Sequence, residues 1–180
     1  EIIRLDKSVY EGKKFTARYK TSGYYDIRAF NDGFKTNIYA KRTDREIFED
    51  EFFGKWLENP TAYGAFEGKK LLGYAEGSIE SWNNRFRISN ICVFENSERR
   101  RGIGTALIEK ISKTAKSLKA RMIVLETQSC NENAIAFYKK HGFEIIGFDL
   151  FSYTNDDPIR HEIRIEMGKK YNVDNKNFYK

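Results

Sequence analysis

The sequence is poor in cysteine, proline and histidine, and each shortage excludes a class of protein. Two cysteines, Cys92 and Cys130, cannot build the disulfide framework of a small secreted scaffold, and free thiols suit a reducing cytoplasm. The two histidines have no cysteine or second histidine at ligand spacing, so we expect no metal site. Two prolines in the whole chain leave no rigid linker. We therefore expect one domain over residues 1–180, with residues 171–180 as a frayed tail.

The chain also lacks a long apolar run. No stretch reaches the ~18 apolar residues of a membrane-spanning helix, so we expect no membrane partner. The chain begins at Glu1 rather than Met, and the sequence leaves open what precedes it. Aromatic residues, by contrast, are plentiful at 15%, with 14 Phe and 11 Tyr. This composition favours strands and a core built around a sheet.

The net charge of +6 raises the question of nucleic-acid binding. The sequence contains no basic helix interleaved with aromatics, no zinc spacing and no aromatic RNA-binding signature. Basic residues are scattered except at Arg99–Arg101. We therefore expect no nucleic-acid partner, and instead a local anion site on a solvated surface.

Residue patterns in the first third predict a hairpin and a helix. Tyr24–Phe30 and Phe34–Ala40 read as strands joined by a turn at Asn31–Gly33. Thr43-Asp44-Arg45-Glu46 matches a capping box, and apolar residues then recur at helical spacing as far as Leu57. We expect a helix there that packs on the core.

The rest of the chain predicts a meander followed by alternating helices and strands. The expected strands are 62–67, 71–82, 85–94, 122–125, 143–153 and 159–167, and the expected helices are 104–118 and 134–141. The order strand, helix, strand around 88–127 predicts a parallel pair joined by a crossover. The fold class is therefore α/β (α+β): a mixed, mostly antiparallel sheet with helices on both faces.

The basic run Arg99-Arg100-Arg101 is followed by Gly102-Ile103-Gly104 and lies between a predicted strand and a predicted helix. Glycine lets the backbone approach a ligand closely. The first amides of a helix lack internal partners and bind phosphate. Neither the Walker loop nor the dinucleotide fingerprint fits, because no Gly-Lys-Ser/Thr follows and the third glycine is absent.

A second segment, residues 131–143, gives this loop a family context. Together the two segments resemble the GNAT family of N-acetyltransferases over roughly residues 63–153. The loop matches the family's Arg/Gln-x-x-Gly-x-Gly/Ala at Arg99, Gly102 and Gly104. The downstream motif Asn-x-x-Ala-x-x-(Leu/Phe)-Tyr-x-x-x-Gly-Phe matches at Asn131, Ala134, Phe137, Tyr138, Gly142 and Phe143. Residues 125–128, Leu-Glu-Thr-Gln, are similar to the streptothricin acetyltransferase branch.

The resemblance implies that the parallel strands splay apart and admit the pantetheine arm of acetyl-CoA. It implies that the Val93 amide serves the developing oxyanion. Asn131 has a second interpretation as the N-cap of the following helix. The residues expected to bind acetyl-CoA are Ile91, Val93, Arg99, Arg100, Arg101, Gly102, Ile103, Gly104, Thr105 and Asn131.

The resemblance also places Tyr138 as the acid that protonates the departing thiolate; its alternative is a packed helix tyrosine. The family's usual glutamate base is replaced here by Ser89 and Asn90, so the base stays unassigned. Three carboxylates on predicted strands, Glu76, Glu80 and Glu126, are candidates for holding a cationic acceptor. Their alternative is pairing with neighbouring cations on the sheet.

These observations favour an N-acetyltransferase that moves acetyl from acetyl-CoA to a primary amine of a small molecule, such as a streptothricin-like cation, or of a peptide. A non-catalytic acyl-CoA sensor, which keeps the loop but lacks a competent acid and base, stays open at this stage. The sequence leaves monomer and homodimer equally open.

Overall fold

The computed structural model describes residues 1–94 and 102–171, with the backbone alone described over 39–47. Within these ranges a sheet runs in the order β1-β4-β5-β6-β7-β9-β8, and β2 and β3 form a separate hairpin. The sheet strands are β1 (Ile2–Arg4), β4 (Thr61–Glu67), β5 (Lys70–Glu80), β6 (Arg85–Val93), β7 (Met122–Gln128), β8 (Glu144–Asp149) and β9 (Arg164–Lys170). The hairpin and helices are β2 (Lys14–Phe30), β3 (Gly33–Glu51), α1 (Lys7–Tyr10), α2 (Ile103–Ser117), α3 (Glu132–Lys140) and α4 (Asp157–Arg160).

The sheet is antiparallel at every junction except one. β6 and β7 pair in parallel, and α2 makes the crossover between them. The predicted mixed sheet and its one parallel pair are confirmed. None of the helices in the described ranges is both long and apolar enough to cross a membrane.

Two hydrophobic clusters lie on the sheet. The larger one joins the apolar stripe of α2, including Leu107 and Ile111, to the sheet and to Ile135 of α3. The smaller cluster contains Phe15 of β2 and Tyr74 of β5, with Tyr10 of α1 packed against it. The long helices therefore pack in the larger cluster and α1 in the smaller one, while the hairpin contributes to both, with Ile27 in the larger and Phe15 in the smaller.

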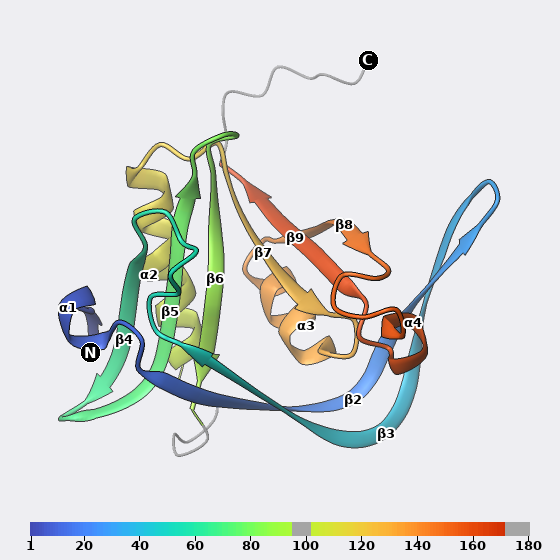
Figure 1. The fold of residues 1–180 in the computed structure, drawn as a ribbon, viewed down its shortest axis with the longest axis horizontal. Coiled ribbons are helices and arrows are strands. Elements are labelled where there is room, and N and C mark those ends of the chain that lie inside the picture. Colours follow the sequence, from blue (N-terminus) through green and yellow to red (C-terminus); the bar gives the residue numbers. More distant parts are fainter. Residues whose placement is uncertain (95–101, 172–180) are drawn as a thin grey trace.

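The β2–β3 hairpin crosses the molecule along the carboxyl ends of β6 and β7 and projects beyond β8 (Figure 1). The Tyr25 amide donates to the Ser129 carbonyl just after β7, at 2.9 Å. The Asn133 side chain in α3 donates to the Lys20 carbonyl, at 3.1 Å. These bonds anchor the middle of the hairpin over the region where the two parallel strands end.

The predicted helix after residue 43 is wrong. β3 continues to Glu51, and its pairing with β2 runs to the Lys14–Glu51 pair. A local capping pattern is worth about 1 kcal/mol. It is overridden here by a ladder that satisfies the backbone of both strands. Phe52, expected on the helix face, follows the strand together with Phe53, and both are buried in the smaller cluster.

The predicted strand 159–167 is also wrong at its start. Pro158 lies in the first turn of the short helix α4, and strand β9 begins only at Arg164. The buried Asp157 carboxylate accepts the Tyr153 and Thr154 amides, each at 2.8 Å, and so fixes the turn ahead of the helix. A proline early in a helical turn loses no backbone bond. Residues 171–180 were expected to form a frayed tail. The Tyr171 hydroxyl donates to the Ser112 carbonyl at 2.9 Å, and residues 172–180 lie outside the described residues.

Candidate active site

The two parallel strands separate toward their carboxyl ends, as the resemblance implied. Their last paired residues are Ile88 of β6 and Leu125 of β7, yet β6 runs on to Val93. The edge of β6 that faced β7 therefore continues over 89–93 without that partner. An extended ligand can pair with such an edge as another strand would. Ile91 and Val93, two of the expected cofactor residues, belong to this stretch.

A β-bulge sits beside the point of separation. The pairing of β5 with β6 shifts between the Glu76–Asn90 pair and the Gly77–Ile88 pair, so Ser89 is the extra residue. A Cβ atom at Gly77 would lie 2.5 Å from a backbone oxygen of β6, which only glycine avoids. Bulges bend a strand and redirect its side chains. This one lies where β6 leaves β7.

The amino end of α2 lies just after β6 in the chain. Its N-cap is Gly102, with a left-handed φ of 75° and no side chain to cap the helix. A Cβ atom added there would meet nothing within 4 Å among the described residues. The first amides of a 15-residue helix, here at Ile103, Gly104 and Thr105, have no intrahelical partner. Arg99, Arg100 and Arg101, also expected at this loop, lie outside the described residues.

Gly104 has a second reason to be small. A Cβ there would lie 3.3 Å from the Phe137 ring of α3 and 3.8 Å from Val93. The Thr105 hydroxyl lies 3.4 Å from Nε2 of His141, at the end of α3. The glycine therefore lets α2 and α3 approach each other beside the end of β6, and this brings both family motifs to one place.

Tyr138 reaches this place from α3. Its side chain is buried between the rings of Phe137 and Phe143. Burial raises the pKa of the Tyr138 hydroxyl, and electrostatic interaction with Cys92 of β6 adds to the rise. The hydroxyl therefore stays protonated at neutral pH, as a proton donor must. The packed and the acidic interpretations are compatible.

Asn131 acts as the N-cap of α3. Its side-chain oxygen accepts the Ala134 amide at 3.3 Å. This confirms the capping interpretation, which the helix needs whatever else the residue does. Contact with a cofactor amide stays a prediction.

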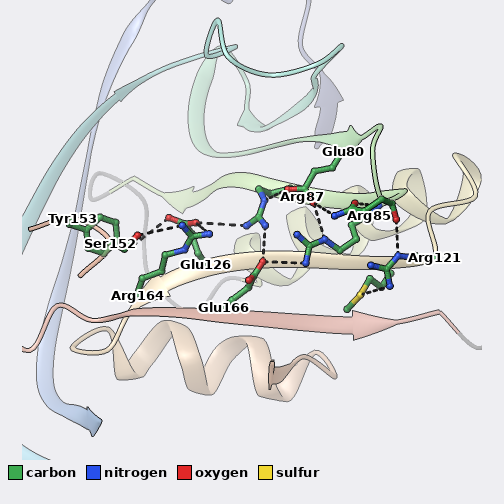
Figure 2. A network of polar contacts seen from close by, with 11 residues as sticks. Glu80, Arg85, Arg87, Arg121, Glu126, Ser152, Tyr153, Arg164 and Glu166 are labelled. Atoms are coloured by element: carbon green, nitrogen blue, oxygen red, sulfur yellow. Dashed lines mark hydrogen bonds and ion pairs between the residues drawn. The ribbon is translucent and has the colours of Figure 1, made fainter. Parts of the chain in front are cut away.

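Glu80 and Glu126 belong to a network of ion pairs (Figure 2). Glu80 pairs with Arg87 at 2.6 Å and with Arg85 at 2.9 Å. Arg87 also pairs with Glu166 of β9, at 2.7 Å. The network thus bridges β5, β6 and β9 in the part of the sheet where β6 and β7 are still paired.

Glu126 extends the network toward the separation of the strands. It lies one residue past Leu125 and pairs with Arg164 at 2.9 Å, with 35% of its side chain exposed. For Glu80, burial opposes ionisation, but hydrogen bonds and charge from Arg87 and Arg85 lower its pKa. The negative charge of Glu80 is therefore balanced by two arginines on the sheet, whereas part of the Glu126 carboxylate is exposed to solvent.

Glu76 is different from the other two carboxylates. It is fully buried, and within the described ranges neither of its carboxylate oxygens forms a hydrogen bond. Burial raises its pKa to about 7, and the nearby Tyr74 and Asn90 side chains only partly offset this. A carboxyl that titrates near neutrality is a group suited to proton transfer.

Asp50 is a neighbour of Glu76 that the sequence did not predict. Its carboxylate accepts the Asn90 side-chain amide at 2.9 Å. Sequence reasoning placed Asp50 inside the expected helix, away from the strands. Cys92 of β6 is partly exposed and lies near both Asp50 and Tyr138. No group of three or more potential metal ligands gathers in the part of the chain that the structure describes.

Comparison with known proteins agrees with this arrangement. The family model described as "Acetyltransferase (GNAT) family" matches residues 24–143. Streptothricin acetyltransferase of Escherichia coli is 36% identical over 138 residues, which cover 77% of this chain and 77% of that protein. Streptothricin acetyltransferase A of Bacillus subtilis (strain 168) is 39% identical over 155 residues, 81% of this chain and 85% of that protein.

Solved structures show the same fold. Nourseothricin acetyltransferase superposes with a TM-score of 0.73 over 94% of this chain and 97% of its own, at 22% identity. A candidate streptothricin acetyltransferase from Bacillus anthracis str. Ames, solved in complex with acetyl coenzyme A, gives a TM-score of 0.71, again at 22% identity. It covers 96% of this chain and 98% of that one.

Proposed function

This chain belongs to the GNAT family of acetyltransferases and is an acetyl-CoA-dependent N-acetyltransferase, and on that premise we propose that its acceptor is a primary amine of a streptothricin-type cationic antibiotic. The observation that carries the choice of acceptor is the similarity to two streptothricin acetyltransferases over more than three quarters of the chain. The sensor alternative loses its support, because the matched relatives are named as enzymes.

The amino end of α2 holds the pyrophosphate of acetyl-CoA in this proposal. Gly102 is the N-cap of this helix and leaves the space beside it free of a side chain, and the helix dipole adds a partial positive charge. The amides of Ile103, Gly104 and Thr105, with Arg99, Arg100 and Arg101, complete the anion site. The edge of β6 at Ile91 and Val93 pairs with the pantetheine amides, and Asn131 contacts the same arm.

Three jobs then fall to this chain's own groups. The Val93 amide donates to the oxygen of the acetyl carbonyl as negative charge develops on it. The Tyr138 hydroxyl gives its proton to the departing sulfur, and its raised pKa means that it still carries that proton at neutral pH when the sulfur leaves. The accessible edge of Glu126 attracts the cationic acceptor, and Glu80 acts only through the network that fixes β5 and β6.

The surroundings of the reaction follow from the same residues. Cys92 and Cys130 are free thiols, which suit a reducing cytoplasm. A chain that modifies a small molecule needs neither nucleic acid nor membrane as a partner, and one copy holds all the groups named above. Monomer and homodimer both accommodate this site.

The test is release of coenzyme A thiol in the presence of a panel of amines. The panel contains streptothricin, a peptide with a free amino terminus and a small monoamine without further charge. We expect kcat/KM for streptothricin to exceed that for the monoamine by at least about tenfold, a difference of about 1.4 kcal/mol. Equal rates for all three amines, or a preference for the peptide, would contradict this choice of acceptor.

A further inference from the structure

The carboxyl of Glu76 is buried without an ion-pair partner among the described residues. It lies on β5 opposite Asn90 of β6, and its oxygens form no hydrogen bond with any residue in the described ranges. A buried polar group without a partner costs roughly 1–3 kcal/mol. Glu80, on the same strand, shows what a structural carboxylate looks like here, since two arginines pair with it. No arginine or lysine of the described ranges pairs with Glu76.

The groups that face Glu76 come from three strands. Tyr74 lies two residues away on β5, Asn90 lies across on β6, and Asp50 near the end of β3 adds a repulsive negative charge. Asp50 accepts the Asn90 amide at 2.9 Å and so fixes the orientation of that side chain. The Phe53 amide donates to the Tyr74 hydroxyl at 3.4 Å. None of these groups neutralises Glu76 by pairing.

Glu76 also lies at the level where the strands separate. Its partner Asn90 is two residues beyond Ile88, the last residue of β6 that pairs with β7. Cys92, further along β6, interacts electrostatically with Tyr74 on one side and with Tyr138 on the other. Tyr74, which contacts Glu76, and Tyr138 are therefore both neighbours of Cys92 on the unpaired end of β6.

We propose that Glu76 is the general base of the acetyl transfer and that Asp50, through Asn90, is its positioning residue. This inference rests on the proposed function. The amine nitrogen forms a bond to the acetyl carbonyl carbon, and the carbon–sulfur bond breaks. The Glu76 carboxylate takes one proton from that nitrogen and later releases it to solvent. The Tyr138 hydroxyl gives one proton to the sulfur and regains one from solvent, so protons balance.

The protonation state fits this role. Burial raises the pKa of Glu76 to about 7, so a large fraction is carboxylate at neutral pH and the conjugate acid is not too weak to lose its proton again. This chain has Ser89 and Asn90 where the family usually has its glutamate base. Its Glu76 carboxyl lies on the neighbouring strand β5, directly opposite Asn90.

The test is the pH profile of kcat/KM for streptothricin in the wild-type chain and in Glu76→Gln. The wild type should rise with pH to a plateau, with a midpoint near 7. Glu76→Gln should lose about 10²-fold in kcat together with this rise. Its affinity for acetyl-CoA should not change. Glu58→Gln, at an exposed loop carboxylate, is the matched control and should keep both rate and profile.

A second variant, Asp50→Asn, tests whether Asp50 acts on Glu76 or only supports the fold. In Asp50→Asn the negative charge beside Glu76 is gone, so the midpoint of the rise should move to lower pH while most of the rate remains. A merely structural role for Asp50 would leave the midpoint in place. Glu76→Asp keeps the acid but shortens it, and should fold while losing most of its rate.

Three results would overturn the assignment. One is a Glu76→Gln variant that keeps the rise and the rate. Another is a carboxyl resonance of Glu76, followed by carbon NMR in the wild type, that titrates at the ordinary value near 4.3. The third is a wild-type chain that binds acetyl-CoA and acetylates no amine, which overturns the proposed function and Glu76 with it. Normal turnover with an unchanged Glu76→Gln profile overturns Glu76 alone.

Discussion

At the scale of single residues, the hydroxyl of Tyr138 separates chemistry from packing. Tyr138→Phe keeps the ring between Phe137 and Phe143 and removes only the proton donor. We expect kcat to fall by roughly 10²-fold, within the range for general acids, and acetyl-CoA affinity to stay constant. Steady-state kinetics and calorimetry measure the two effects. The control is Tyr171→Phe, which removes a hydroxyl that donates to the Ser112 carbonyl. An unchanged kcat with chemistry rate-limiting would remove the acid role.

Glu76 should also affect the stability of the chain. Its folded-state pKa of about 7 lies above that of the unfolded chain, about 4.3, so the folded state holds the proton between these values. The contribution of this group to stability is full below the unfolded value and is lost as pH rises through about 7. The free energy of unfolding of Glu76→Gln, relative to that of the wild type, should therefore increase by about 3 kcal/mol from about pH 4 to about pH 8. Urea unfolding at both pH values measures this; an equal difference at both would contradict it.

The residue types of the site could be read from the sequence, but their surroundings could not. Tyr138 and Asn131 were found because a motif fixes their spacing along one helix. Whether a carboxylate is compensated depends on arginines from other strands, as at Glu80, or on their absence, as at Glu76. Such pairs depend on the register between neighbouring strands: Glu80 and Arg87 are seven residues apart, whereas Arg87 and Glu166 are 79 apart.

At the scale of elements, Gly102 at the amino end of α2 has a matched control in Gly12, which follows α1. Gly102 and Gly12 have φ of 75° and 74°, and a Cβ at either would meet nothing within 4 Å. Alanine at either position should cost the same backbone strain of roughly 1 kcal/mol. Only Gly102→Ala places a methyl group where phosphate approaches, so we expect roughly tenfold weaker acetyl-CoA binding by calorimetry. Equal affinities in the two variants would contradict this phosphate site.

The ion-pair network of Glu80, Arg87 and Glu166 lies where β6 and β7 are still paired, and it should hold β5, β6 and β9 in register. Arg87 contacts Glu80 and Glu166 and is only 13% exposed. Arg87→Leu leaves two carboxylates short of a partner, and we expect a loss of about 3 kcal/mol. Arg160→Leu breaks the exposed pair with Glu162 and should cost under about 1 kcal/mol. Urea unfolding compares the two; similar losses would show that the network adds no stability.

Elements with a clear period were predicted, and those set by distant partners were not. The stripe of α2 and the meander of β4, β5 and β6 follow from local patterns. The continuation of β3 to Glu51 depends on pairing with β2, which begins at Lys14. The short helix α4 depends on the Asp157 carboxylate, whose partners precede it in a loop. In both places a local pattern was overridden by contacts that the pattern does not contain.

At the scale of the whole molecule, the net charge of +6 makes an acidic acceptor site stand out against the mean field. Glu126 shares its carboxylate with Arg164 and is 35% exposed. Glu126→Gln should raise KM for a cationic acceptor, and the increase should shrink as salt screens the attraction. Initial rates at low and high salt measure it, with Glu144→Gln on β8 as the control. A salt-independent KM in Glu126→Gln equal to that of the wild type would exclude this role.

The most direct test of the account is the product that the full chain makes from acetyl-CoA and streptothricin. Mass spectrometry should show the antibiotic with one added acetyl group, and NMR should place that group on an amino nitrogen. Formation of the product should match the release of coenzyme A thiol mole for mole. Unmodified antibiotic after incubation with a chain that binds acetyl-CoA would contradict the account.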